Sequence, residues 1–342
     1  MRARELGIEI GTLPPGPENA ITDVGGVRVG HCTLIEGDDV RTGVTVVFPH
    51  EGDPALDPVF AGSHVLNGNG EVTGLAWVRE SGLLTSAIGL TNTFSVGVVR
   101  DALVASAIEG SPVGLTWHLP VVGETWDGRL NDIEGMHVRA EHVREAIAAA
   151  SGGPAVEGNV GGGTGMICHG FKGGIGTASR TAGDWTVGVL VQANHGRRAR
   201  LTVDGVAVGE SLPPERVPLP GPRDDGGGSI IVVAATDAPL LPHQCDRLAQ
   251  RALLGVARTG GAGENSSGDF AVAFATGNRG LDVKNELVPL RMLPNERIDP
   301  LFYAGIEATE EAIVNALLAA ETMTGRGGTV AHALDPELLR RA

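Results

Sequence analysis

A hydroxyl-rich loop that runs straight into an apolar segment is the stretch of this sequence best suited to chemistry. Residues 263–269 read Gly-Glu-Asn-Ser-Ser-Gly-Asp, and residues 270–276 that follow are apolar apart from a final threonine. The length and composition of the apolar segment predict a buried strand. Ser267 would then stand at the mouth of a strand, where a side chain is held rigidly and still reaches a cleft. Glycines among residues 260–263 open backbone conformations closed to other residues.

Such a loop suits a hydroxyl that attacks the carbonyl group preceding it. The product would be a new N-terminal Ser267, whose free amine titrates near pH ~8 and can serve as a built-in base. The plainer interpretation is a glycine-rich turn before a strand, with serines that serve turn chemistry. The local sequence leaves both interpretations open.

Glu124 is the second residue whose position suggests chemistry. It follows an apolar segment at residues 121–123 and precedes the turn at residues 125–128. A carboxylate at a strand end can pair with a substrate ammonium group in a partly dry site. A solvated loop acid is the alternative, and the sequence alone does not decide between the two.

The glycine-rich residues 159–180 do not form a phosphate-binding loop. Neither G-x-x-x-x-G-K-[ST] nor G-x-G-x-x-G occurs there, and a strand pattern rather than a helix follows. We expect this stretch to pack backbone against backbone or against a substrate. Residues 197–228, rich in proline and glycine and without periodicity, predict a long surface excursion or a lid.

The positioning elements follow from hydrophobic patterning. The patterns predict both strands and helices, which makes the fold class α/β. Strands are expected at residues 41–48, 185–194, 229–237 and 270–276, and helices at residues 98–108, at 135–150, from about 239 to 258, and from Asp299 onward.

Composition restricts the classes of partner. The 342 residues carry 26 Lys and Arg against 41 Asp and Glu, a formal net charge of −15, which argues against a nucleic-acid or anionic-membrane partner. Three cysteines are too few for a disulfide framework, and no apolar run approaches ~20 residues, so we expect a cytoplasmic protein. No His, Cys, Asp and Glu cluster has ligand spacing, which predicts that neither a metal nor another cofactor is needed.

Nine short motifs follow one another in the order of a known family, between about residue 20 and residue 318. They lie at residues 21–31, 41–45, 67–71, 122–125, 171–180, 192–194, 235–240, 267–269 and 308–312. Together they resemble the DmpA family of self-processing N-terminal-nucleophile aminopeptidases, which includes L-aminopeptidase/D-alanine esterases and β-peptidyl aminopeptidases. The resemblance covers nearly the whole chain.

The resemblance implies an αββα sandwich like that of N-terminal-nucleophile hydrolases, with its own chain topology. Residues 1–342 would form a single catalytic domain, cut into residues 1–266 and 267–342, and the pieces would stay together in a homotetramer. The implied activity is that of a serine aminopeptidase or amidase. Its substrates would be small peptides, amides or esters with a free amino group, and no cofactor is implied.

The resemblance also assigns roles by position. Ser267 would be the nucleophile, Asn194 would donate to the oxyanion, and Glu124 would hold the free amino group of the substrate. A hydroxyl and a carboxylate that assist in the family correspond best to Thr309 and Glu311.

One of these assignments stays open, and another departs from the family. Glu310 is the alternative to Glu311 as the assisting carboxylate. His169 occupies a substrate-side position where relatives can carry a tyrosine.

One departure concerns the cleaved bond. Relatives are usually cut after asparagine or glycine, whereas Ser266 precedes Ser267 here. A cut before Ser266 would restore the usual residue, but we favour Ser267 because its register to the following strand decides where the hydroxyl points. An unprocessed amine-binding protein and an acyltransferase remain the alternative functions, and the sequence does not distinguish α-peptides, β-peptides, D-residue amides and esters as substrates.

Overall fold

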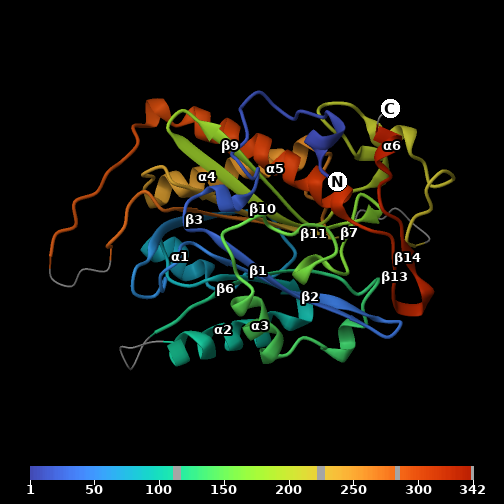
Figure 1. The fold of residues 1–342 in the computed structure, drawn as a ribbon, viewed down its shortest axis with the longest axis horizontal. Coiled ribbons are helices and arrows are strands. Elements are labelled where there is room, and N and C mark those ends of the chain that lie inside the picture. The colour runs from blue at the N-terminus through green and yellow to red at the C-terminus, as the bar shows by residue number, and fades with distance from the viewer. Residues whose placement is uncertain (111–116, 222–227, 282–285, 340–342) are drawn as a thin grey trace.

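Two β-sheets lie face to face with helices on both outer sides in the computed structural model, which describes residues 1–110, 117–221, 228–281 and 286–339 (Figure 1). The first sheet has the strand order β1-β2-β5-β6, and the second has the order β4-β3-β12-β11-β10-β9. The expected αββα sandwich is therefore confirmed. The first sheet comprises β1 (Arg28–Glu36), β2 (Val40–Phe48), β5 (Ile88–Asn92) and β6 (Val121–Thr125). The second comprises β4 (Leu83–Leu84), β3 (Val59–Gly68), β12 (Gly268–Ala275), β11 (Ser229–Thr236), β10 (Trp185–Asn194) and β9 (Gly174–Ala182).

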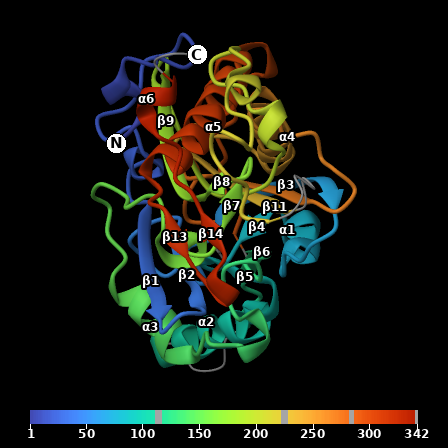
Figure 2. The same ribbon diagram turned by 90° about the vertical axis from the view of Figure 1, so that its right-hand side faces the viewer.

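The helices cover the two outer faces and the ends of the sandwich. Helices α2 and α3 pack under the first sheet, and α4 and α5 pack over the second (Figure 1). The described helices are α1 (Leu75–Ser81), α2 (Val96–Gly110), α3 (Ala140–Ala148), α4 (Pro242–Arg258), α5 (Asp299–Ala319) and α6 (Pro336–Leu339). Short strand pairs join β7 (Ile167–Cys168) with β8 (Phe171–Lys172) and β13 (Met323–Thr324) with β14 (Val330–Ala331). After α5 the chain returns past both sheets through β13 and β14 (Figure 2), where Arg41 Nε donates to the Thr324 carbonyl at 2.8 Å.

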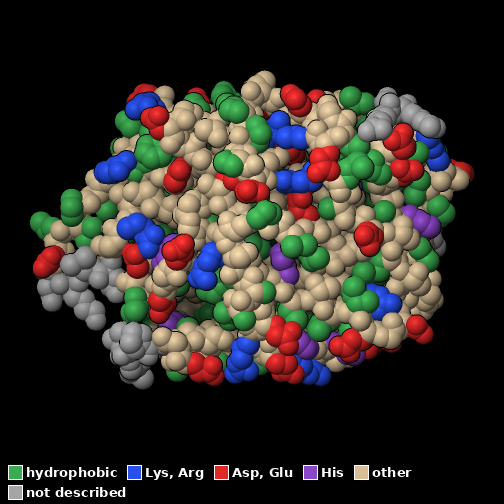
Figure 3. All heavy atoms as spheres, viewed as in Figure 1, with side chains coloured by type: hydrophobic (Ala, Val, Ile, Leu, Met, Phe, Trp, Pro, Cys, Tyr) green, Lys and Arg blue, Asp and Glu red, His purple; other side chains and the backbone are tan. Residues whose placement is uncertain are grey.

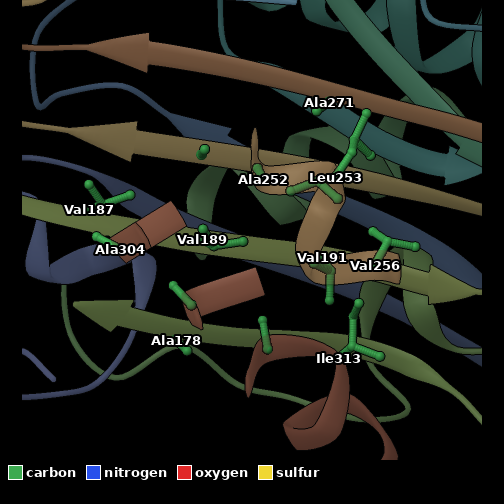
Figure 4. Packing of buried hydrophobic residues seen from close by; sticks show 14 of the residues in the cluster. Ala178, Val187, Val189, Val191, Ala252, Leu253, Val256, Ala271, Ala304 and Ile313 are labelled. Atoms are coloured by element: carbon green, nitrogen blue, oxygen red, sulfur yellow. The ribbon is translucent and has the colours of Figure 1, made fainter. Parts of the chain in front are cut away.

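The apolar side chains of the second sheet alternate between two cores, as the period of a strand requires. In β12, Phe270, Val272 and Phe274 face the first sheet, whereas Ala271 and Ala273 face the helices. Figure 4 shows the helix-side core, where Ala271 and side chains of β9 and β10 meet those of α4 and α5. A third core lies between the first sheet and helices α2 and α3.

The register of the second sheet determines which residues meet at its edge. Strand β11 pairs with β12 in parallel and with β10 in antiparallel orientation, and β3 pairs with β12 in antiparallel orientation. Asn194, Ser229, Gly268 and Gly68 therefore form one row across four strands. The residue before Gly268 is Ser267, so the central strand of this sheet brings Ser267 to its edge.

Glycines in the predicted glycine-rich stretch allow close backbone packing. A Cβ atom on Gly176 would lie 1.9 Å from the carbonyl oxygen of Ala312 in α5, and one on Gly174 would lie 2.1 Å from that of Gly158. The prediction of backbone packed against backbone is confirmed at these positions.

One sequence-based expectation is wrong. The predicted helix at residues 135–150 is shorter, because Met136 adopts a left-handed φ of 48° that separates a 3-10 turn at Ile133–Gly135 from α3. Residues 197–221 do form an irregular surface segment with residues 204–207 and 213–216 exposed, and Leu201 and Leu212 anchor it in the helix-side core. Residues 222–227 of the same predicted segment lie outside the described part of the chain.

The surface carries charges of both signs. On the face drawn in Figure 3, Asp and Glu side chains lie interspersed with Lys and Arg. Among the described helices, none combines the length and the hydrophobicity that spanning a bilayer requires.

Candidate active site

Ser267 is held between a tight turn and the start of β12. Its backbone N–H donates to the Glu264 carbonyl at 2.8 Å, which closes the turn at residues 264–267. Its side chain is buried, and Oγ donates to Asp269 Oδ1 at 2.6 Å. Residues two apart on a strand share a face, so the strand itself brings the carboxylate to the hydroxyl.

Asp269 is a carboxylate in a largely dry environment. Burial raises its pKa to about 6, a shift that the hydrogen bond from Ser267 opposes and the nearby Glu264 carboxylate reinforces. A carboxylate with a raised pKa is a stronger base than an ordinary aspartate. The pair of Ser267 and Asp269 can therefore transfer a proton from the hydroxyl to the carboxylate.

Two asparagines, one near the end of β3 and one just after it, hold the turn that precedes Ser267. Asn67 Nδ2 donates to the Glu264 carbonyl at 3.0 Å and also to the Ser267 carbonyl, and Asn69 Nδ2 donates to the Ser266 carbonyl at 2.9 Å. The carbonyl group of the Ser266–Ser267 peptide bond is thus bonded to a side-chain amide. This arrangement fixes the bond relative to the end of the second sheet.

A cavity of about 710 Å³ opens beside this turn. It lies where the edge row of the second sheet meets β6 of the first sheet. Its walls come from both sheets: Gly68, Asn69, Gly70, Glu71, Thr93, Val96, Glu124, Trp126, Arg129, Gly228, Ser229 and Ser266. The cavity therefore joins the residue before the predicted nucleophile to the predicted amine anchor.

Glu124 is presented to the cavity by β6. Its side chain is 2% exposed, Oε1 accepts from the Glu71 backbone N–H at 2.9 Å, and Oε2 accepts from Thr93 Oγ1. Burial raises the pKa of Glu124, and the two neutral donors oppose that shift only in part. A buried carboxylate on a cavity wall is suited to receive an ammonium group, because a cation offsets the cost of burying the charge.

Asn194 ends β10 on the face that looks toward the first sheet. Its Oδ1 accepts from the Ile167 N–H at 2.7 Å, and its Nδ2 donates to the carbonyl of Trp126, a cavity residue, at 2.9 Å. One strand, β11, lies between it and Gly268 in the edge row, so two inter-strand spacings, roughly 10 Å, separate the two residues. Nδ2 carries a second hydrogen, so the amide is both fixed in orientation and able to donate once more.

Thr309 and Glu311 have hydrogen-bond partners of their own in the structure, and their assisting role stays a prediction. Glu311 is buried against Arg180 Nη2 at 2.5 Å. Strand pairing places Arg180 in one row with Ala275 across the sheet. Ala275 lies at the opposite end of β12 from Ser267, a separation of roughly 20 Å along the strand.

The neighbours of Glu311 on α5 have partners of their own. Thr309 Oγ1 donates to the Gly305 carbonyl of its own helix at 2.7 Å. The alternative carboxylate, Glu310, pairs with Arg258 and accepts from the Asp204 N–H at 3.2 Å. Both residues serve the packing of α5 rather than the cavity.

His169 is fully buried. Its Nδ1 donates to the Arg197 carbonyl at 3.0 Å, and its φ of 49° is left-handed. Burial lowers the pKa of its imidazole to about 4, and the Glu264 carboxylate, on the turn before Ser267, opposes that shift. The substrate-side role of His169 stays a prediction.

Among the described residues, Cys168, His169 and His195 form one group of possible metal ligands, with ligand atoms up to 4.8 Å apart. Ligand atoms around a tetrahedral zinc ion lie about 3.5 Å apart, whereas Cys168 Sγ and His195 Nδ1 lie 3.8 Å apart. Burial raises the pKa of the Cys168 thiol to about 12, and the buried Lys172 lies nearby. We interpret the group as a neutral interior cluster, and independence from metals stays a prediction.

Sequence reasoning gave Ser229 no role and read Asp269 only as part of a motif. It placed Asn69 and Thr93 among polar residues that could line a cleft or serve a turn, and the structure places both on the cavity wall. For Asp269 a signal existed, because a residue two positions after Ser267 in a strand shares its face. Ser229 Oγ accepts from the Gly268 N–H at 3.2 Å, a contact that depends on a strand pairing invisible in the sequence.

Comparison with known proteins agrees with this geometry. The family model described as Peptidase family S58 matches residues 19–331. The β-peptidyl aminopeptidase BapA of Sphingosinicella microcystinivorans is 47% identical over 362 aligned positions, covering 99% of this chain and 91% of that protein. The chain therefore belongs to peptidase family S58, and the predicted resemblance is confirmed.

Solved structures define the class more closely. A β-aminopeptidase of Burkholderia sp. superposes with a TM-score of 0.94 at 56% identity, covering 100% of this chain and 99% of that chain. The L-aminopeptidase D-Ala-esterase/amidase of Ochrobactrum anthropi, described as a prototype of the serine aminopeptidases with a variant of the Ntn hydrolase fold, has a TM-score of 0.91 at 42% identity over 99% and 97% of the two chains. The fold of this chain is that variant, and the chain is an enzyme of the aminopeptidase class.

Proposed function

We propose that this protein is a self-activated serine aminopeptidase that releases N-terminal residues from small peptides, amides or esters with a free amino group. One observation carries the proposal: a single cavity is lined both by Ser266, at the bond to be cut, and by the buried carboxylate of Glu124. Family membership supplies the reaction class.

Activation would cut the Ser266–Ser267 bond and give pieces 1–266 and 267–342. Ser267 would then carry a free α-amine next to its own hydroxyl. That amine titrates near pH ~8 and is able to take the hydroxyl proton as Oγ attacks a substrate carbonyl. The acyl group would pass to Ser267 and then to water.

Two further residues would complete the reaction. Asn194 would donate its second Nδ2 hydrogen to the developing oxyanion, a role supported by an amide group already fixed by two backbone partners. Glu124 would bind the ammonium group of the substrate, a role supported by its burial on the cavity wall.

The test combines mass and substrate comparison. Intact mass of the purified protein should show two pieces whose boundary is the Ser266–Ser267 bond. Chromogenic amides with a free amino group should be hydrolysed much faster than their N-acetylated forms. β-Alanyl and α-alanyl amides should be compared first, because two similar proteins are named β-aminopeptidases. A chain that is uncut and inactive on all of these amides would be an amine-binding protein instead.

The homotetramer and the cytoplasmic location are part of the same proposal. They are supported by the family resemblance and by the charge and cysteine content of the chain. Mass photometry of the purified protein tests the assembly state.

A further inference from the structure

A substrate ammonium group asks for more than one acceptor on the cavity wall. This inference rests on the proposed function, in which Glu124 receives the free amino group of the substrate. An ammonium group carries up to three N–H donors, and each donor that leaves water needs an acceptor in its place. A protein oxygen beside Glu124 would therefore add both affinity and selectivity for a primary amine.

The two carboxylate oxygens of Glu124 have different surroundings. Oε1 accepts from the Glu71 backbone N–H at 2.9 Å and faces the backbone of Gly70, where an added Cβ atom would lie 2.8 Å from it. Oε2 accepts from the hydroxyl of Thr93, a half-buried residue that lines the same cavity. Because the chain encloses Oε1, Oε2 is the oxygen better placed to meet a ligand, and Thr93 lies beside it.

A buried asparagine fixes the position of Thr93. Asn92 ends β5 and is 1% exposed. Its Oδ1 accepts from the Phe94 N–H at 3.1 Å, which caps the 3-10 turn at Thr93–Ser95. Its Nδ2 donates to Thr42 Oγ1 of β2 at 2.7 Å. The turn that carries Thr93 is therefore tied to the first sheet.

We propose that Thr93 and Glu124 together form the subsite for the substrate ammonium group. The Thr93 hydroxyl uses its one hydrogen in the bond to Glu124 Oε2, so the groups that its oxygen can still offer are lone pairs. An ammonium group between the two residues would donate one N–H to Oε2 and a second to Thr93 Oγ1. The pair selects a primary amine by two acceptors held in one arrangement.

The same hydrogen bond acts on the charge of the anchor. Burial raises the pKa of Glu124, the Thr93 hydroxyl and the Glu71 N–H lower it, and the Glu71 carboxylate raises it. Among the described residues, Arg129 is the other charged side chain on this cavity wall. Loss of the hydroxyl should therefore raise the pKa of Glu124 and leave less of the anchor charged.

The test compares kcat/KM for a free-amine substrate and its N-acetyl form, using whichever of β-alanyl and α-alanyl p-nitroanilide the parent hydrolyses faster. Thr93→Val removes the hydroxyl at nearly constant volume, and Thr93→Ser keeps it. Thr276→Val is the matched control, because this threonine follows the opposite end of β12, where its Oγ1 donates to the Thr236 carbonyl at 3.4 Å. Melting temperatures of all variants check the fold.

We expect Thr93→Val to lower kcat/KM for the free-amine substrate about 10- to 100-fold and to leave the N-acetyl form nearly unchanged. Thr93→Ser and Thr276→Val should stay close to the parent. The acid limb of the free-amine pH profile should move to higher pH in Thr93→Val, because the carboxylate then protonates at higher pH, and Thr93→Ser should keep the limb of the parent. Equal losses for both substrates, or no loss in Thr93→Val, would overturn the subsite.

A double-variant cycle tests whether the two residues act as a pair. Adding Thr93→Val to Glu124→Gln should cost far less than it costs in the parent, because the glutamine amide then donates to the threonine oxygen. Equal costs in the two backgrounds would show that Thr93 acts apart from Glu124, which overturns the paired subsite.

The outcomes separate this inference from the proposed function. If Glu124→Gln affects the free-amine and N-acetyl substrates alike, the amine anchor itself is refuted, and the subsite with it. If Glu124→Gln is selective for the free-amine substrate while Thr93→Val equals the parent, only the role of Thr93 is refuted.

Discussion

Replacing Glu124 by glutamine removes one negative charge from the cavity wall and leaves the shape almost unchanged. The carboxylate now accepts from the Glu71 N–H and from the Thr93 hydroxyl. A glutamine can keep both contacts, since its oxygen accepts from the N–H while its amide nitrogen donates to a reoriented hydroxyl. The variant should therefore fold normally, and its effect should report the charge alone.

The magnitude follows from the loss of a charge-assisted hydrogen bond in a buried position. Hydrogen bonds to charged groups contribute about 1.5–3 kcal/mol. If the substrate ammonium group meets Glu124 in the transition state, kcat/KM for free-amine substrates should fall about 10- to 150-fold. N-acetylated substrates lack the cation and should be affected far less.

The assay compares kcat/KM for a free-amine amide and its N-acetyl form in the parent and in Glu124→Gln. The extent of self-cleavage, read by intact mass, should be unchanged, because no free amino group is recognised in that step. Equal losses for both substrates would refute the amine-anchor reasoning and make Glu124 a structural residue of the β6 end.

Four further predictions follow from the same structure. Ser267→Ala should remain one uncut chain without hydrolytic activity, as shown by a denaturing gel and an amide assay; cleavage at the same bond would refute the nucleophile. Asn194→Ala should lower kcat about 10²- to 10³-fold with little change in KM, measured by steady-state kinetics. Burial raises the pKa of Glu124, so kcat/KM for free-amine substrates should fall as pH drops through a value above that of an ordinary glutamate, because protonation removes the charge; this acid limb should be lost in Glu124→Gln. Arg180→Met should leave Glu311 buried without its closest cation and lower the free energy of unfolding by about 3–5 kcal/mol, measured by denaturant titration.

Hydrophobic periodicity predicted individual strands and helices, whereas the layers of the sandwich were implied by the family resemblance that the ordered motifs carry. Strands β10, β11 and β12 and helices α4 and α5 lie where the patterns placed them, to within a few residues. The helix predicted at residues 135–150 was too long at its start, because nothing in the composition marks Met136 as left-handed. Residues 197–221 lie on the surface as predicted, but their anchoring by Leu201 and Leu212 could not be predicted, because the buried side chains follow no period.

The site was predictable to the extent that strand geometry fixes it. Glu124 was singled out because it follows an apolar segment, and the structure places it on the cavity wall. The assisting role of Thr309 and Glu311 stays a prediction, because position in a motif does not state which face of α5 turns toward β9 and which toward α4. Asn69 was noted only as a cleft or turn residue, because its contact with Ser266 joins residues 197 positions apart in the chain.

The position of β12 in the middle of its sheet has a consequence for the proposed two-piece enzyme. The shorter piece would begin one residue before a strand that is paired on both sides, by β3 and by β11, and would also supply α5. Severing one peptide bond leaves all of those pairings in place, so the pieces could separate only by opening the sheet along two seams. Such a heterodimer should not exchange its short piece with neighbouring molecules, and its two chains should unfold in one concerted transition.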